Sequence, residues 1–107
     1  MLDTTKRAAD YEVLGPWPEA DPVPARGISK RLASLEGKTI GLFANGKRAA
    51  VPMLEALERG LKAKYPSLKT SWYKCSVFNT PEILTHGKEK FEAWVRGVDA
   101  VALTVGD

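Results

Sequence analysis

The stretch Asp99-Ala100-Val101-Ala102-Leu103-Thr104-Val105-Gly106-Asp107 reads as a buried strand that closes on a glycine and an aspartate. An almost continuous, valine-rich apolar run is typical of a strand covered by helices on both faces. In open α/β sheets, the chemistry lies just beyond the carboxyl ends of such strands. We therefore expect a site at this end, with Asp107 as a candidate catalytic residue at its edge.

Two earlier segments have the β-branched and aromatic character of strands, residues 38–44 and 68–77. Between them, apolar residues recur at helical spacing over residues 50–65. A second helix is expected to begin at Thr80 and Pro81 and to end at Arg96-Gly97. Its predicted buried face consists of Ile83, Leu84, Gly87, Phe91, Trp94 and Val95.

The order of elements from Lys38 is therefore βαβαβ. Right-handed crossovers make the three strands parallel and place a helix over each connection. We predict an α/β fold of three layers, a Rossmann-like half of a doubly wound domain, over residues 37–107. Such a half is expected to be an incomplete domain.

Residues 1–36 are predicted to form an extended, proline-rich arm and linker. Gly15-Pro16-Trp17-Pro18 and Asp21-Pro22-Val23-Pro24 exclude a helix and a central strand, because proline fixes its φ angle and has no amide hydrogen. Val13, Leu14 and Trp17 are costly to leave in water, so the arm is expected to lie across the domain or a partner chain. The alternative is a flexible leader.

Composition restricts the class of protein. The chain has 107 residues, 44% of them hydrophobic and 27% charged, which suits one globular domain. Its net charge of +3 is spread along the sequence, and this argues against a nucleic-acid partner. No window has the roughly 20 apolar residues of a membrane span, and residues 1–7 are not followed by an apolar core of signal-peptide length, so we expect neither a membrane span nor a signal peptide. One cysteine excludes an internal disulfide and favours a reducing, cytoplasmic location.

The loop after the first strand is a candidate anion site. Asn45, Gly46, Lys47 and Arg48 lie between a strand and the amino end of a helix, where amides and the helix dipole favour negative charge. The loop lacks the G-x-G-x-x-G and P-loop spacings of nucleotide sites. A plain turn is the alternative, and no cofactor can be identified from these residues.

Cys75 lies near the end of the second predicted strand and is a further candidate. A free cysteine usually behaves as a small buried hydrophobe, and a reactive thiol would need exposure and a lowered pKa. His86 falls in the second helix without other metal ligands beside it, and we expect it to face solvent.

Two parts of the chain carry a family resemblance. The segment 35–47, LEGKTIGLFANGK, and the closing segments 98–101 and 104–107 resemble the first part of the UGSC-motif family of selenoproteins and their cysteine counterparts. In that family, the Gly-Asp that ends this strand is followed by selenocysteine or cysteine and then by Gly-Ser-Cys. The resemblance implies a reactive pair just beyond Asp107.

Selenocysteine is encoded by UGA, which is ordinarily a stop codon. One hypothesis is therefore that these residues are the amino-terminal part of a redox selenoprotein read as ending at that codon, and that this part alone is inactive. Two chalcogens separated by two residues can close a small ring, and the attacking group is the deprotonated form. The full-length form would then be an oxidoreductase acting on a small molecule.

The alternative is a small interaction subunit or anion-binding α/β module that docks a partner chain. Three parallel strands with two helices leave an open sheet edge and much apolar surface. Both interpretations therefore predict a homo-oligomer or a partner subunit.

Overall fold

The computed structural model describes residues 10–76 and 81–106. Contacts divide the chain into two units, residues 1–30 and 31–107. Within the described range, residues 10–30 contain no helix or strand. Leu35 packs against the core of the second unit, and its carbonyl accepts a hydrogen bond from the Lys38 amide at 3.2 Å. The domain division made from the sequence and the extended arm stay predictions.

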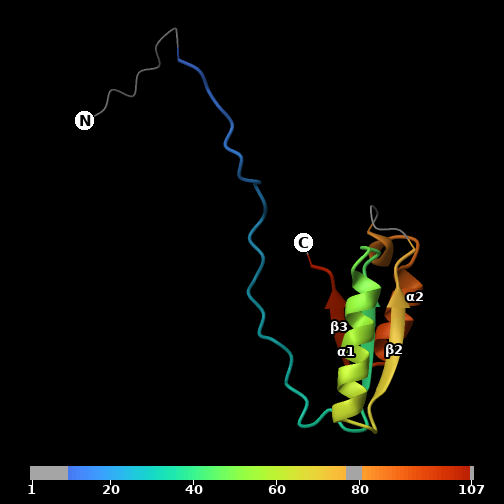
Figure 1. The fold of residues 1–107 in the computed structure, drawn as a ribbon. Coiled ribbons are helices and arrows are strands. Elements are labelled where there is room, and N and C mark those ends of the chain that lie inside the picture. The colour runs from blue at the N-terminus through green and yellow to red at the C-terminus, as the bar shows by residue number, and fades with distance from the viewer. Residues whose placement is uncertain (1–9, 77–80, 107) are drawn as a thin grey trace. The chain divides into compact units, whose positions relative to one another are not determined.

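The second unit is a small α/β structure built on a three-stranded parallel sheet (Figure 1). Its strands are β1 (Thr39–Ala44), β2 (Lys69–Lys74) and β3 (Ala100–Thr104), in the spatial order β2-β1-β3. Both pairings are parallel, with Leu42 opposite Trp72 on one side and Ala102 on the other. The predicted parallel sheet is confirmed, and the carboxyl ends of the three strands share one edge.

The central strand is β1, and five of its six residues are buried. The expectation that the last strand is covered on both faces is wrong. In β3, Val101 is 43% exposed and Leu103 is 54% exposed. The reason is position: β3 has a strand neighbour on one side alone within the described sheet, and the aromatic cluster of the second helix lies over β1 and β2.

Helix α1 (Ala50–Lys64) confirms the first predicted helix. Its buried residues Ala50 and Leu54 pack against Ile40, Leu42 and Ala44 on one face of the sheet. Pro52 lies in the first turn, where its missing amide hydrogen costs the helix little. The helix ends before Pro66, because the residue that precedes a proline is disfavoured in helical conformation.

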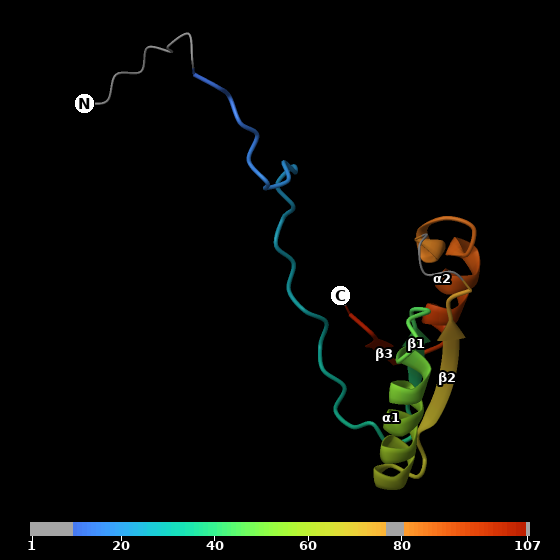
Figure 2. The same ribbon diagram turned by 45° about the horizontal axis from the view of Figure 1, so that its top comes forward.

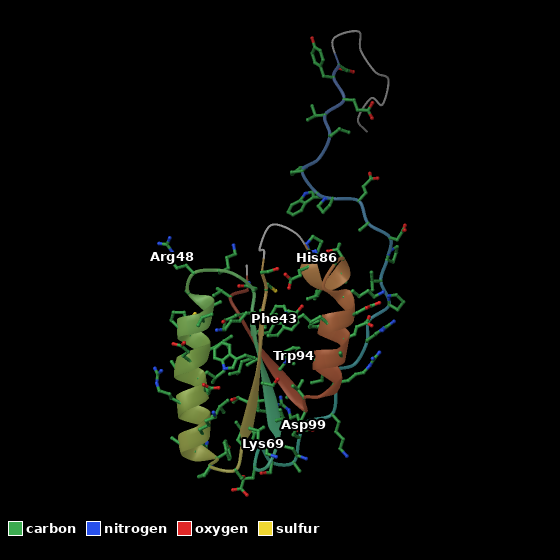
Figure 3. All side chains as sticks on the ribbon, turned by 90° about the vertical axis from the view of Figure 1, so that its right-hand side faces the viewer. Phe43, Arg48, Lys69, His86, Trp94 and Asp99 are labelled. Carbon is green, nitrogen blue, oxygen red and sulfur yellow. The ribbon has the colours of Figure 1, made fainter. Side chains whose placement is uncertain are left out.

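The opposite face of the sheet is covered by aromatic side chains from β1, β2 and α2 (Lys88–Arg96). Figure 3 shows α1 and α2 on either side of the strands, with Phe43 and Trp94 between the strands and α2. Phe43 stacks on Tyr73 with ring centroids 5.3 Å apart, and Phe91 meets both rings edge-on. Gly41 makes room for the Trp94 ring, because a Cβ there would lie 2.7 Å from it.

The second helix does not run continuously from Pro81. A short 3₁₀ helix, η1 (Glu82–Leu84), precedes a turn, and α2 begins at Lys88. This segment, drawn in orange, lies beyond the arrowhead of β2 (Figure 2). The break has a cause, since the Glu82 side chain turns back to bind the end of β2.

Two residues of the predicted buried face are therefore exposed, Leu84 at 72% and Val95 at 37%. The predicted cap Thr80 lies outside the described residues, as does Val77, the predicted end of the second strand. The assignment to the Rossmann-like class stays a prediction.

Candidate functional site

The carboxyl edge of the sheet brings together the residues that follow the three strands. Ala44 is in register with Lys74 and with Thr104, so Asn45, Cys75 and Val105 follow at the same level. Figure 3 shows Arg48 and His86 at this end of the unit, and Lys69 and Asp99 at the other. Asp107, the predicted catalytic residue, lies outside the described residues.

Asn45 fastens the ends of β1 and β3 together. Its backbone amide donates to the Thr104 carbonyl at 3.1 Å, and its side-chain Nδ2 donates to the Val105 carbonyl. Its Oδ1 accepts from the Lys47 amide at 3.2 Å, while Gly46 takes a φ of 90°, which a glycine adopts without strain. Asn45 thus sets both the loop and the course of the chain beyond β3.

The amino end of α1 carries positive charge and no side-chain cap. Ala49 is the capping residue, it makes no side-chain cap bond, and the first turn has no acidic residue. The Ala50 amide donates to the Lys47 carbonyl at 3.0 Å and Pro52 has no amide hydrogen, so two of the first three helical residues offer no amide to a ligand. Lys47 and Arg48 precede it with exposed side chains. The Thr104 hydroxyl donates to the Ala50 carbonyl at 2.9 Å, so the end of β3 lies beside this helix start. The exposed charges of Lys47 and Arg48 are therefore the feature of this loop that favours an anion, and anion binding stays a prediction.

A second group of polar side chains lies at the end of β2, around Glu82. The Glu82 carboxylate is buried, with 6% of the residue exposed. It accepts hydrogen bonds from the Ser76 hydroxyl, from the Ser76 amide at 2.9 Å and from the Tyr73 hydroxyl at 3.2 Å. The bonds from Ser76 are the main reason why the pKa of Glu82 falls to about 2. Glu82 is therefore an anion throughout the neutral range.

Cys75 lies next to this carboxylate and is half-buried. Burial raises the pKa of its thiol, and the Glu82 charge and a hydrogen bond to Glu82 raise it further. A thiolate is the nucleophilic form, so a raised pKa keeps Cys75 in its less reactive state. This favours the inert-thiol alternative for Cys75.

His86 is confirmed as an exposed residue, with 59% of its side chain accessible. Its Nε2 lies 3.6 Å from a Glu82 oxygen, so protonation would add a cation beside the buried carboxylate. Glu82 was not among the site residues predicted from the sequence. One signal was present, since Tyr73 and Cys75 lie on the same side of the predicted strand 68–77. Nothing in the pattern shows that a glutamate from the next segment turns onto that side.

Among the residues that the structure describes, no group of three or more histidine, cysteine or carboxylate side chains is placed to hold a metal ion. In the same residues, no helix has the length and apolar character that a membrane crossing needs.

In the comparison with family models, the model of the UGSC family matches residues 12–107. The chain belongs to the UGSC family. The resemblance seen in the first and last strands is therefore confirmed, and it extends through the whole α/β unit. The UGSC match also begins within residues 10–30, so most of the segment without helix or strand is part of the family pattern. No curated protein and no solved structure matches the chain.

Proposed function

We propose that this chain is the amino-terminal part of a UGSC-family thiol or selenol redox protein whose reactive pair follows Asp107. One observation carries the proposal: the UGSC match continues through β3, whose carboxyl end lies beside the positively charged loop after β1. On this proposal the sheet is a Rossmann-like half, and the site forms at its carboxyl edge.

The loop would favour the reactive anion. A selenolate or thiolate attached just after β3 would lie near the start of α1, because Thr104 bonds to Ala50 and Asn45 bonds to Val105. The helix dipole and the charges of Lys47 and Arg48 lower the pKa of such a group. In the reaction, the reduced pair transfers two electrons and two protons to a disulfide substrate. The S–S bond of the substrate breaks to give two thiols, and a Se–S or S–S bond closes between the two chalcogens of the pair.

The first test is to read the source gene in frame beyond the codon for Asp107. We expect UGA followed by codons for Gly-Ser-Cys and further α/β sequence. An ordinary stop codon followed by unrelated sequence would contradict the proposal.

The second test uses the uninterrupted product, with a cysteine codon in place of UGA, oxidised by a small disulfide such as oxidised glutathione. We expect the loss of two thiols and of two mass units per chain. Arg48→Glu should slow the oxidation several-fold, because it removes positive charge near the pair. Arg59→Glu, an equal change of charge at an exposed position of α1, is the matched control. Equal rates in the two variants would contradict the role of the loop.

The exposed charges of Lys47 and Arg48 also support a second candidate, a small anion-binding module. Such a site predicts that millimolar phosphate or sulfate raises the unfolding temperature above that in chloride of equal ionic strength. Arg48→Glu should abolish the increase, and the absence of any shift in the wild type would count against the site.

A further inference from the structure

Strand β3 presents an open edge of the sheet. The Asn45 amide donates to the Thr104 carbonyl, so the backbone polar groups of Thr104 face β1. Successive residues of a strand point these groups in alternate directions, and the register pairs Ala102 with Leu42 in the same way. The backbone amides and carbonyls of Val101 and Leu103 therefore point away from β1, along the open edge.

The two edge strands of the sheet differ in whether they carry residues that discourage pairing with a further strand. Strand β2, the other edge, has Lys69 and Lys74 at its ends, and lysines on an edge strand discourage pairing with another strand. Strand β3, with the sequence AVALT, has no charged residue and no proline. An edge without such protection is suited to pair with a further strand.

One face of β3 is also bare. Ala100 and Ala102 pack toward the core under α1. Val101 lies on the opposite face, beside Gly41 and the Trp94 ring, and it remains 43% exposed. Leu103, on the same side of the strand, is 54% exposed. The uncovered apolar surface therefore lies on the face that carries α2.

The handedness of strand connections shows where a helix that follows β3 would lie: over Val101 and Leu103. The chain passes from β2 across β1 to β3 with α2 on one face of the sheet. A further right-handed crossover outward from β3 runs in the same direction, so its helix lies on that same face. The strand that completes the crossover then lies along the open edge of β3.

The size of the edge favours an occupant from the same chain. A strand of five residues is about 17 Å long and, at a sheet thickness of about 10 Å, offers on the order of 200 Å² per partner. Stable association of separate chains needs about 800 Å² per partner.

We propose that, in the uninterrupted UGSC protein, the segment after residue 107 covers β3 with a helix on Val101 and Leu103 and with a parallel strand along its edge. This inference rests on the proposed function, because that function supplies the segment.

Hydrogen exchange in the uninterrupted product tests the pairing. We expect the Val101 and Leu103 amides to be protected by about 100-fold or more, as the Ala102 amide is through β1. Fast exchange at Val101 and Leu103 beside a protected Ala102 would overturn the proposal. Protection that disappears on dilution would also overturn it, because a second copy would then be the occupant.

A substitution tests the covering helix separately. Leu103→Lys should lower the unfolding temperature of the uninterrupted product by about 5 °C or more. Met53→Lys is the matched control, since Met53 on α1 is half-exposed and is expected to stay so. Equal decreases in unfolding temperature for the two variants would contradict the proposed helix over Leu103. If the gene reads on and the pair is redox-active but these results fail, the inference fails while the proposed function stands.

Discussion

At the scale of single residues, Glu82 organises the end of β2. Its carboxylate accepts bonds from Tyr73 and Ser76 and lies beside Cys75 and His86. Burial of a carboxylate is unfavourable unless hydrogen bonds replace those of water, and here they do. One side chain thus sets the ionisation of its neighbour and interrupts the segment that leads into α2.

Replacing Glu82 should make Cys75 more acidic. In Glu82→Gln, the negative charge that helps to raise the pKa of the thiol is gone, so the midpoint of alkylation against pH should fall. We expect iodoacetamide to modify Cys75 several-fold faster at pH 8 than in the wild type. The measurement is the alkylation rate of this one cysteine over a range of pH.

Tyr73→Phe is the matched control for that change. It removes one hydrogen-bond donor to Glu82 but keeps the carboxylate charge and the ring that stacks on Phe43. The Cys75 midpoint should therefore stay raised. A midpoint that falls equally in both variants would show that loosened packing, and not the Glu82 charge, controls the thiol.

Acid should destabilise the fold through Glu82. Its pKa in the folded chain is about 2, below the ordinary value of 4.5, so the ionised carboxylate stabilises the fold at higher pH. This contribution is complete above about pH 5 and is lost as the pH falls toward 2. The difference in unfolding temperature between wild type and Glu82→Gln should shrink over that window. A difference that stays constant would contradict the lowered pKa.

At the scale of elements, periodicity predicted α1, and the predicted end of the second helix at Arg96-Gly97 is confirmed, but its predicted start at Pro81 is wrong. The spacing of Val51, Leu54 and Leu61 is set by local geometry, so the sequence reveals it. The break before Lys88 depends on a contact between Glu82 and the end of β2, which no local pattern contains. Likewise, the apolar run of β3 predicted a strand covered on both faces, and this was wrong. Burial depends on which elements pack against a strand, and the run itself does not show them.

The packing of α2 on the sheet predicts a strict need for glycine at position 41. In Gly41→Ala, the new Cβ would lie 2.7 Å from the Trp94 ring, which is held by a bond from its Nε1 to the Ser71 hydroxyl at 2.9 Å. We expect a loss of about 1–3 kcal/mol in the free energy of unfolding, measured with denaturant.

Gly60→Ala is the control for that substitution. Gly60 lies within α1 with open space around it, and alanine there should gain about 0.5–1 kcal/mol. Equal stability of the two variants would mean that the Trp94 ring moves aside without cost.

At the scale of the whole molecule, the segment before the sheet carries unusual apolar exposure for its length. Its exposed large side chains are Tyr11, Val13, Leu14, Trp17, Val23 and Ile28. We expect the apparent mass in light scattering to rise with concentration, because such residues favour association. The double variant Leu14→Ser, Trp17→Ser should reduce the rise, and a constant monomer mass for the wild type would contradict it.

The sequence predicted that the strand ends meet at the carboxyl edge of the sheet, but it predicted only some of the contacts between the residues there. Parallel strands follow from the βαβαβ order, so the meeting of Asn45 and Cys75 at one edge could be expected. The bonds that tie Asn45 to Val105 and Thr104 to Ala50 join residues that are far apart in the chain. Contacts of that range depend on how the folded elements pack, which a sequence pattern does not contain.

The central position of β1 also affects how the chain folds as it is synthesised. Its partners lie about thirty residues later in β2 and about sixty residues later in β3. At about 5–20 residues per second, the ribosome releases them several seconds apart. Strand β1, the most deeply buried of the three, is thus synthesised first and stays unpaired until β2 and β3 have been synthesised. During that interval, the apolar residues of β1 have no strand partner, and unpaired apolar strands favour aggregation.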